Sequence, residues 1–225
     1  MIRAVIFDMF ETLITHYETP LYFGREVAAD LGIEDAALRP LWDGTETERT
    51  IGAMTIDEVV RRIMEENGCY SEELLQKVLQ KRVDTKVDCF RHLKEGLIPM
   101  LEELKARGVK IAVLSNCYYE EARVIRESRL APFFDVFCLS CELGMKKPDP
   151  AIFKVCLDEL RLPAQECLYV GDGGDRELEV AGSLGMQTAQ ACWYLKEGTY
   201  QPCGILDGFT NAMQPGDILG LLDLS

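Results

Sequence analysis

Residues 1–13 read MIRAVIFDMFETL. The apolar, β-branched run at positions 4–7 predicts a first strand that ends at Asp8, and it is too short for the apolar region of a signal peptide. In an open α/β sheet, ligands bind beyond the carboxyl ends of the strands, so a carboxylate at this place faces a ligand crevice. The alternative is that Asp8 caps a turn in an ordinary loop.

Four more segments have a strand-like composition, namely residues 110–114, 135–139, 167–170 and 187–191. Helical patterns lie between most of them. They cover residues 99–107, 150–160 and 176–184, and each has a plausible start or stop signal, such as Gly108 after the first or Pro150 at the beginning of the second. Strands that alternate with helices predict a Rossmann-like α/β core, a parallel sheet with helices on both faces.

The long segment between the first and second strands is different, because it contains helical patterns and no convincing strand. Thr55 and Glu58 form a capping-box pattern ahead of an apolar stripe, and Ser71 is suited to begin a further helix. We therefore expect an inserted α-helical cap over the active site. The predicted boundaries are residues 1–15 and 97–225 for the core and residues 16–96 for the cap.

The composition limits the partners of the protein. Its 225 residues include 24 Lys and Arg against 38 Asp and Glu, which gives a net charge of −14. This charge repels nucleic acid and anionic membrane surfaces, and no apolar run approaches the ~18 residues of a membrane span. The nine cysteines are scattered and odd in number, which suits reduced thiols in the cytoplasm. We expect a cytoplasmic protein that acts on a small molecule, with no nucleic-acid or membrane partner.

Three further segments carry candidate functional side chains. Ser115 and Asn116 follow the second strand, where they either face the ligand crevice or cap the next helix. Lys147 lies in a loop that contains prolines. The prolines either hold the lysine in a fixed position, or its side chain is simply solvated. Asp172 follows the fourth strand, and Glu177 lies on the first turn of the next helix. Two carboxylates at a strand end are ligands suited to a hard cation such as Mg²⁺.

Together with the segment around Asp8, these segments resemble the four motifs of the haloacid dehalogenase-like (HAD) superfamily, in the same order. The resemblance covers essentially the whole chain. Residues 147–153, which read KPDPAIF, are most similar to the subfamily with a helical cap inserted after motif one. The resemblance implies a Mg²⁺-dependent hydrolase, most often a phosphatase, that acts on a small phosphorylated substrate.

The resemblance also implies roles for individual residues. Asp8 is similar to the nucleophile, which attacks phosphorus to form an aspartyl-phosphate. Thr12, Ser115 and Asn116 match residues that bind the transferring phosphoryl group. Lys147 matches the lysine that neutralises charge beside the nucleophile. The implied Mg²⁺ ligands are the side chains of Asp8, Asp172 and Glu177 and the backbone carbonyl of Phe10.

Phe10 departs from the family pattern. Family phosphatases usually carry a second Asp at this position, which protonates the leaving group and then activates water. Phenylalanine can do neither. His16 is the nearby residue with a pKa suited to proton transfer, so it either replaces the missing acid or makes a structural hydrogen bond at the start of the cap.

Three alternatives to a phosphatase stay open. HAD dehalogenases and phosphonatases also lack the second Asp, and a weakly catalytic binding protein is the third alternative. The two acids of the metal motif favour phosphorus chemistry, because attack on carbon gains nothing from a bound cation. A phosphonatase needs a cap lysine as a Schiff base, and Lys77, Lys81 and Lys86 lie in the right region. Arg49, in the insertion, is either a substrate contact or an exposed helical arginine.

Overall fold

The apolar runs of the sequence pair with one another as a parallel sheet. The computed structural model describes residues 1–196 and 204–223. The strands in these ranges are β1 (Ala4–Phe7), β2 (Lys110–Ser115), β3 (Val136–Leu139), β4 (Cys167–Gly171), β5 (Gln187–Ala191) and β6 (Thr210–Ala212). They form one six-stranded sheet with the order β3-β2-β1-β4-β5-β6, and every neighbouring pair is parallel. The prediction of a parallel α/β core is confirmed.

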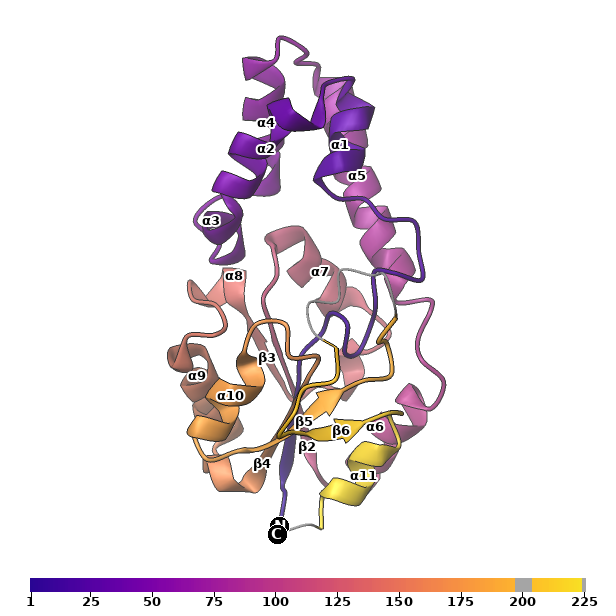
Figure 1. Cartoon of the computed structure of the whole chain (residues 1–225), viewed down its shortest axis with the longest axis vertical. Coiled ribbons are helices and arrows are strands. Elements are labelled where there is room, and N and C mark those ends of the chain that lie inside the picture. The colour runs from indigo at the N-terminus through magenta and orange to yellow at the C-terminus, as the bar shows by residue number, and fades with distance from the viewer. Residues whose placement is uncertain (197–203, 224–225) are drawn as a thin grey trace.

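Helices cover both faces of this sheet (Figure 1). Successive side chains of a strand point to opposite faces, so Val5 and Phe7 join one apolar cluster while Ala4 and Ile6 join the other. The helices on the first face are α6 (Leu97–Ala106), α7 (Tyr119–Glu127) and α11 (Asp217–Leu221), and those on the second are α9 (Pro150–Leu160) and α10 (Glu177–Ser183). The remaining core elements are α8 (Ser140–Leu143) and two 3-10 turns (Ala131–Phe133 and Ala164–Glu166).

The connections of the sheet diverge between β1 and β4. From β1 the chain runs outward through β2 and β3, whereas β4 is followed by β5 and β6 on the other side. Such a point opens a crevice at the carboxyl ends of the two central strands. Phe7 pairs in register with Val170, and the Asp8 amide donates a hydrogen bond to the Val170 carbonyl at 2.9 Å. Asp8 and Asp172 therefore emerge at the same edge of the sheet.

A block of helices stands over this edge (Figure 1). Its members are α1 (Gly24–Leu31), α2 (Asp35–Gly44), α3 (Glu46–Thr50), α4 (Ile56–Glu66) and α5 (Glu72–Cys89). They enclose an apolar cluster of their own around Trp42, Ile63 and Val78. The predicted capping box begins α4, where Thr55 and Glu58 exchange hydrogen bonds at 2.7 and 3.3 Å. The inserted helical cap is thus confirmed, while its boundaries at residues 16 and 96 stay a prediction.

Buried ion pairs join the cap to the core. Arg82 of α5 lies 2.8 Å from Glu120 of α7, and Lys86 lies 2.9 Å from Glu121. These side chains are at most 10% exposed. A buried charge is tolerated only when a partner offsets its lost hydration, so these two pairs fix the cap helix above the carboxyl edge of the sheet.

Two further expectations concern the chain as a whole. The described part of the chain includes no helix that is both long and apolar enough to span a membrane. The cysteines in residues 1–196 and 204–223 are free thiols, and all but Cys69 are buried. Burial makes such thiols small apolar core residues.

Candidate active site

Asp8 lies at the centre of the site, directly after β1. Its Oδ1 accepts a hydrogen bond from the Met9 amide at 2.7 Å, and its Oδ2 lies 2.8 Å from Nζ of Lys147. Burial raises the pKa of Asp8 to about 6, and the positive charge of Lys147 partly opposes this rise. Two donors therefore hold the buried carboxyl group in one orientation toward the crevice.

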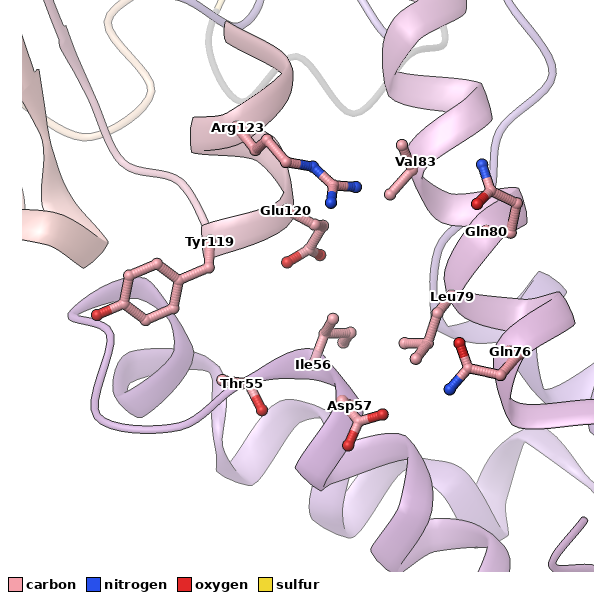
Figure 2. A pocket seen from close by; sticks show the side chains of 10 residues that line it. All are labelled: Thr55, Ile56, Asp57, Gln76, Leu79, Gln80, Val83, Tyr119, Glu120 and Arg123. Carbon is pink, nitrogen blue, oxygen red and sulfur yellow. The ribbon is translucent and has the colours of Figure 1, made fainter. Parts of the chain in front are cut away.

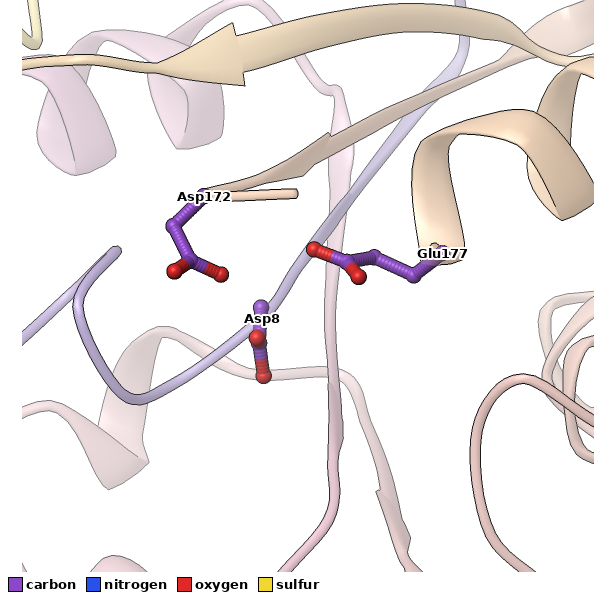
Figure 3. Close-up of side chains that lie close together, drawn as sticks. All are labelled: Asp8, Asp172 and Glu177. Carbon is purple, nitrogen blue, oxygen red and sulfur yellow. The ribbon is translucent and has the colours of Figure 1, made fainter. Parts of the chain in front are cut away.

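Asp172 and Glu177 bring two more buried carboxyl groups to Asp8 (Figure 3). Ligand oxygens of the three residues lie within 4.8 Å of one another. Burial, followed by the charges of Asp8 and Glu177, raises the pKa of Asp172 to about 8. Three carboxyl oxygens that converge in this way are a suitable donor set for a hard divalent cation, and Mg²⁺ fits them.

Local geometry places Glu177 in this cluster. Its Oε1 accepts a hydrogen bond from the Gly173 amide at 2.8 Å, and its Oε2 accepts one from the Asp175 amide at 2.7 Å. A Cβ atom on Gly171 would lie only 2.7 Å from Oε1 of Glu177. Glycine at the end of β4 therefore allows the carboxylate to approach the strand.

Lys147 is the cation of the site and is fully buried. Besides Asp8, its Nζ contacts the Tyr169 hydroxyl at 3.4 Å and lies 3.9 Å from Oδ2 of Asp175. Burial alone would lower the pKa of Lys147, but the surrounding acidic groups, Asp8 foremost, raise it well above its ordinary value. The ammonium group therefore stays charged beside the candidate nucleophile.

Asn116 connects the loops that carry these charges. Its Oδ1 accepts from the Lys147 amide at 2.8 Å, and its Nδ2 donates to the Lys147 carbonyl at 3.1 Å and to Oδ2 of Asp175 at 2.7 Å. Asn116 thus holds the lysine loop in position, whatever contact it makes with a substrate. Sequence reasoning missed Asp175, although it stands between the two predicted metal ligands in the run GDGGD at residues 171–175.

Thr12 and Ser115 are both fully buried. The Thr12 hydroxyl has no hydrogen-bond partner among the described residues, while its carbonyl accepts from Nε1 of Trp193 at 2.7 Å. The Ser115 hydroxyl makes one long contact, at 3.4 Å, with the carbonyl of Asn116. Buried hydroxyl groups normally make a good hydrogen bond, so these two retain bonding capacity for a ligand.

His16 makes two polar contacts through its ring. Nδ1 lies 3.1 Å from Oε1 of Glu11, and Nε2 lies 2.6 Å from Nζ of Lys86. Burial and the neighbouring Lys86 charge lower the pKa of His16. An ammonium group can only donate, so the network assigns the ring proton to Nδ1, toward Glu11. The ring also stacks on Phe10, with centroids 4.7 Å apart, and the role of His16 as a general acid stays a prediction.

Two neighbouring cavities lie in front of these groups. A catalytic pocket of about 340 Å³ is lined by Asp8, Phe10, Glu11, Asn116, Asp172, Gly174 and Asp175. A second space, the cap–core cavity, has a volume of about 290 Å³ and is lined from the cap side by residues such as Trp42, Arg82 and Lys86. Phe10, Asn116 and Asp175 line both. A substrate with its phosphoryl group at Asp8 would therefore extend into the cap–core cavity.

Cap residues in this region are more buried than their sequence suggested. Arg49 is 1% exposed, so the expectation of an exposed helical arginine is wrong, because the rings of Trp42 and Tyr118 cover its guanidinium group at 5.0 and 4.9 Å. Lys86 is also buried, whereas Lys77 and Lys81 are exposed.

A larger groove of about 500 Å³ lies between the cap helices α4 and α5 and the core helix α7 (Figure 2). The cap lines it with the apolar side chains of Ile56, Leu79 and Val83, and α7 lines the facing side with Glu120 and Arg123. None of the candidate catalytic residues lines this groove. The chemistry is therefore expected in the catalytic pocket.

Comparison with known proteins agrees with this arrangement. The family model described as haloacid dehalogenase-like hydrolase matches residues 2–185. The chain belongs to this family. It is 28% identical over 203 residues to a glyceraldehyde 3-phosphate phosphatase of Methanocaldococcus jannaschii, with 84% of this chain and 85% of the relative covered. It is 26% identical over 224 residues to a phosphoglycolate phosphatase of Aquifex aeolicus, with 98% and 97% covered.

A solved structure shares the fold of this HAD-family chain. It is a 2-haloacid dehalogenase from Pseudomonas syringae pv. Tomato DC3000, with a TM-score of 0.69 and 21% identity. The alignment covers 99% of this chain and 98% of that protein. The comparisons thus establish a HAD-like hydrolase with the expected fold, and they include both phosphatases and a dehalogenase.

Proposed function

We propose that this protein is a Mg²⁺-dependent phosphatase that hydrolyses a small phosphorylated metabolite through an aspartyl-phosphate on Asp8. The observation that carries the proposal is the convergence of three buried carboxyl groups beside Lys147. Attack on carbon has no use for such a metal site, whereas phosphoryl transfer places negative charge where a cation and a lysine can offset it. Both phosphatase relatives align over most of their length.

The first step transfers the phosphoryl group to the protein. An oxygen of Asp8 attacks phosphorus, the bond between phosphorus and the leaving oxygen breaks, and that oxygen takes up a proton. Lys147 offsets the charge of the nucleophile and of the phosphoryl oxygens, and the Thr12 and Ser115 hydroxyls donate hydrogen bonds to those oxygens. A divalent cation bound by Asp8, Asp172 and Glu177 would supply further positive charge at the same oxygens.

The second step returns Asp8 to its original state. Water attacks phosphorus, the bond to the Asp8 oxygen breaks, and inorganic phosphate leaves. Phe10 cannot assist either proton transfer. We propose His16, beside Phe10, as the substitute acid, which requires a proton on Nε2, the ring nitrogen that accepts from the Lys86 ammonium group. Lys86 itself lines the cap–core cavity. Helices within residues 16–96 would act as the cap that excludes bulk water from both steps.

Because of Phe10, dehalogenation of 2-haloacids is a second candidate activity. The second Asp that family phosphatases use is absent here, as it is in dehalogenases, and the solved dehalogenase shares the fold. In that reaction Asp8 would attack carbon and halide would leave. No metal would be required. The free thiols favour a cytoplasmic location, and this location remains a prediction for either activity.

One assay separates the two activities. Purified protein is incubated with a panel of phosphorylated metabolites and with 2-haloacids, in Mg²⁺ or in EDTA, and both phosphate and halide are measured. We expect phosphate release that EDTA abolishes, that Mg²⁺ restores and that Asp8→Asn lacks. Equal halide release in EDTA and in Mg²⁺ would contradict the phosphatase proposal and support the dehalogenase activity.

A further inference from the structure

Rings form much of the wall of the cap–core cavity. Five of the described side chains that line it are aromatic: Phe10, His16, Phe23, Trp42 and Tyr118. Three of them form a row, in which His16 stacks on Phe10 with centroids 4.7 Å apart and meets Phe23 edge to face at 5.3 Å. Aromatic side chains pack favourably against a further ring, face to face with an offset or edge to face. The wall is therefore suited to a flat aromatic group.

The charged side chains of this wall offset one another. Among the described residues that line the cavity, three are cationic and three are anionic, namely Arg82, Lys86 and Lys146 against Glu46, Glu121 and Asp175. Lys86 lies 2.9 Å from Glu121, and Arg82 lies 2.8 Å from Glu120 of the same helix. Burial and the charge of Lys86 lower the pKa of His16, so its ring adds no charge. A wall with this balance does not favour an anionic leaving group.

Two of the cations pack on rings of the wall. Nζ of Lys86 lies 5.4 Å from the centre of the Phe10 ring and 5.0 Å from that of Phe23. The guanidinium carbon of Arg82 lies 5.2 Å from the centre of the Trp42 ring. Cations are attracted to the face of an aromatic ring, because the face carries partial negative charge. A further aromatic ring would gain from both the rings and the cations, whereas a saturated ring of similar size would gain only from burial.

Phe10 relates this wall to the chemistry. Its side chain lines both the catalytic pocket and the cap–core cavity, so it borders the place of the phosphoryl group and the space for the leaving group. Phenylalanine cannot protonate the departing oxygen. A phenol has a pKa of about 10, so it departs as its anion far more readily than an alkyl alcohol does. An aromatic leaving group therefore suits both the wall and the missing acid.

We propose that the substrate is a phosphate monoester of a small phenol, whose uncharged aromatic ring occupies the cap–core cavity. The inference rests on the proposed phosphatase activity and adds the substrate class to it. The volume of the cavity, about 290 Å³, agrees with this class. Benzene is held by an apolar cavity of about 150 Å³, so the cap–core cavity has room for one substituted ring.

Two phosphonates separate recognition of the ring from the acidity of the leaving group. Benzylphosphonate and cyclohexylmethylphosphonate have the same charge and nearly the same size, and neither has a leaving oxygen. Burial of apolar surface alone would favour the cyclohexyl compound or neither, whereas contacts between rings favour the benzyl compound. With calorimetry at saturating Mg²⁺, we expect the Kd of benzylphosphonate to be about tenfold lower, because each aromatic contact contributes about two- to tenfold.

Phe23 is the most suitable ring to remove. It is 36% exposed and precedes α1, so its replacement leaves the apolar cluster of the cap intact. Phe23→Leu keeps an apolar side chain and should lower the ratio of the two Kd values by about threefold. Tyr70→Leu is the matched control, because it removes an exposed ring of the cap that does not line the cavity, and it should keep the wild-type ratio.

Phosphate release from phenyl phosphate decides the phosphatase proposal separately. If phosphate is released but the two Kd values are equal, or if Phe23→Leu keeps the wild-type ratio, the aromatic subsite is overturned while the phosphatase stands. A tenfold ratio without phosphate release from any ester supports the subsite and contradicts the phosphatase. Binding of neither phosphonate overturns the subsite, whatever the phosphate assay shows.

Discussion

Replacing Asp172 with Asn should stabilise the metal-free protein and at the same time remove its Mg²⁺ site. In the wild type, burial and the charges of Asp8 and Glu177 raise the pKa of Asp172 from its ordinary 3.8 to about 8. The folded protein then binds a proton that the unfolded chain has released. The free energy of unfolding therefore falls as pH rises between these two values.

The size of the effect follows from this pKa. Each pH unit between the two pKa values lowers the free energy of unfolding by about 1.4 kcal/mol. The slope decreases near pH 8, where the folded protein also loses the proton. The free energy of unfolding therefore falls by about 2 kcal/mol from pH 6 to pH 8. For a protein of this length, about 2–4 °C of Tm corresponds to 1 kcal/mol, so Tm should fall by about 4–8 °C over this range. Mg²⁺ should reverse the loss, because a ligand at one hundred times its Kd adds about 2.7 kcal/mol.

Thermal unfolding in EDTA and in Mg²⁺ at pH 6, 7 and 8 measures these effects. We expect the difference in Tm between Asp172→Asn and the wild type to grow with pH in EDTA, and Mg²⁺ to raise Tm only in the wild type. Asp158→Asn, at an exposed position of α9, is the matched control and should follow the wild type. A difference in Tm that stays constant with pH, or an equal Mg²⁺ effect in Asp172→Asn, would refute the reasoning.

Three further predictions concern the catalytic charges and the contact between cap and core. Lys147→Ala should lower kcat/KM for phosphate release by about 10²–10³-fold, and an effect below tenfold would exclude the lysine from charge stabilisation. Phe10→Asp should raise turnover of alkyl phosphates more than that of aryl phosphates. A general acid contributes about 10²–10⁴-fold to the rate and matters most for poor leaving groups. Equal rate changes across a series of leaving groups would contradict this prediction. Glu121→Gln should leave Lys86 without its carboxylate and destabilise the protein by about 3–5 kcal/mol in urea unfolding, whereas Glu142→Gln, which breaks a largely exposed pair, should change stability by about 1 kcal/mol or less.

The parts of the fold that sequence reasoning predicted are those with a local signal. The apolar run before Asp8 is short and ends at a charge, and it forms β1 as expected. The capping box at Thr55 and the proline at the start of α9 mark where two helices begin. Both signals involve only a few neighbouring residues of the sequence. Because the strands are parallel, the residues that follow them meet at one edge of the sheet, so Asp8 and Asp172 could be placed together from their order alone.

The parts that sequence reasoning missed depend on distant residues. β6 has only three residues and is defined by its pairing with β5 rather than by an apolar run. Arg49 is covered by the ring of Tyr118, the residue before α7, and Lys86 pairs with Glu121 of α7, and no periodicity within the cap shows either contact. Lys146 meets Thr47 across 99 positions of the chain, so its place in the cavity wall appears only once the cap is folded onto the core.

The central claim is that the protein reacts with its substrate at phosphorus and not at carbon. Hydrolysis of one equivalent of substrate by excess protein in ¹⁸O-enriched water tests it directly, with mass spectrometry of both the released phosphate and the peptide that contains Asp8. If water attacks the phosphorus of an aspartyl-phosphate, the heavy oxygen enters the phosphate and Asp8 stays unlabelled, which is the result we predict. Heavy oxygen in the Asp8 side chain would mean that water attacks the carbonyl carbon of an aspartyl ester, as in a dehalogenase, and would contradict the account.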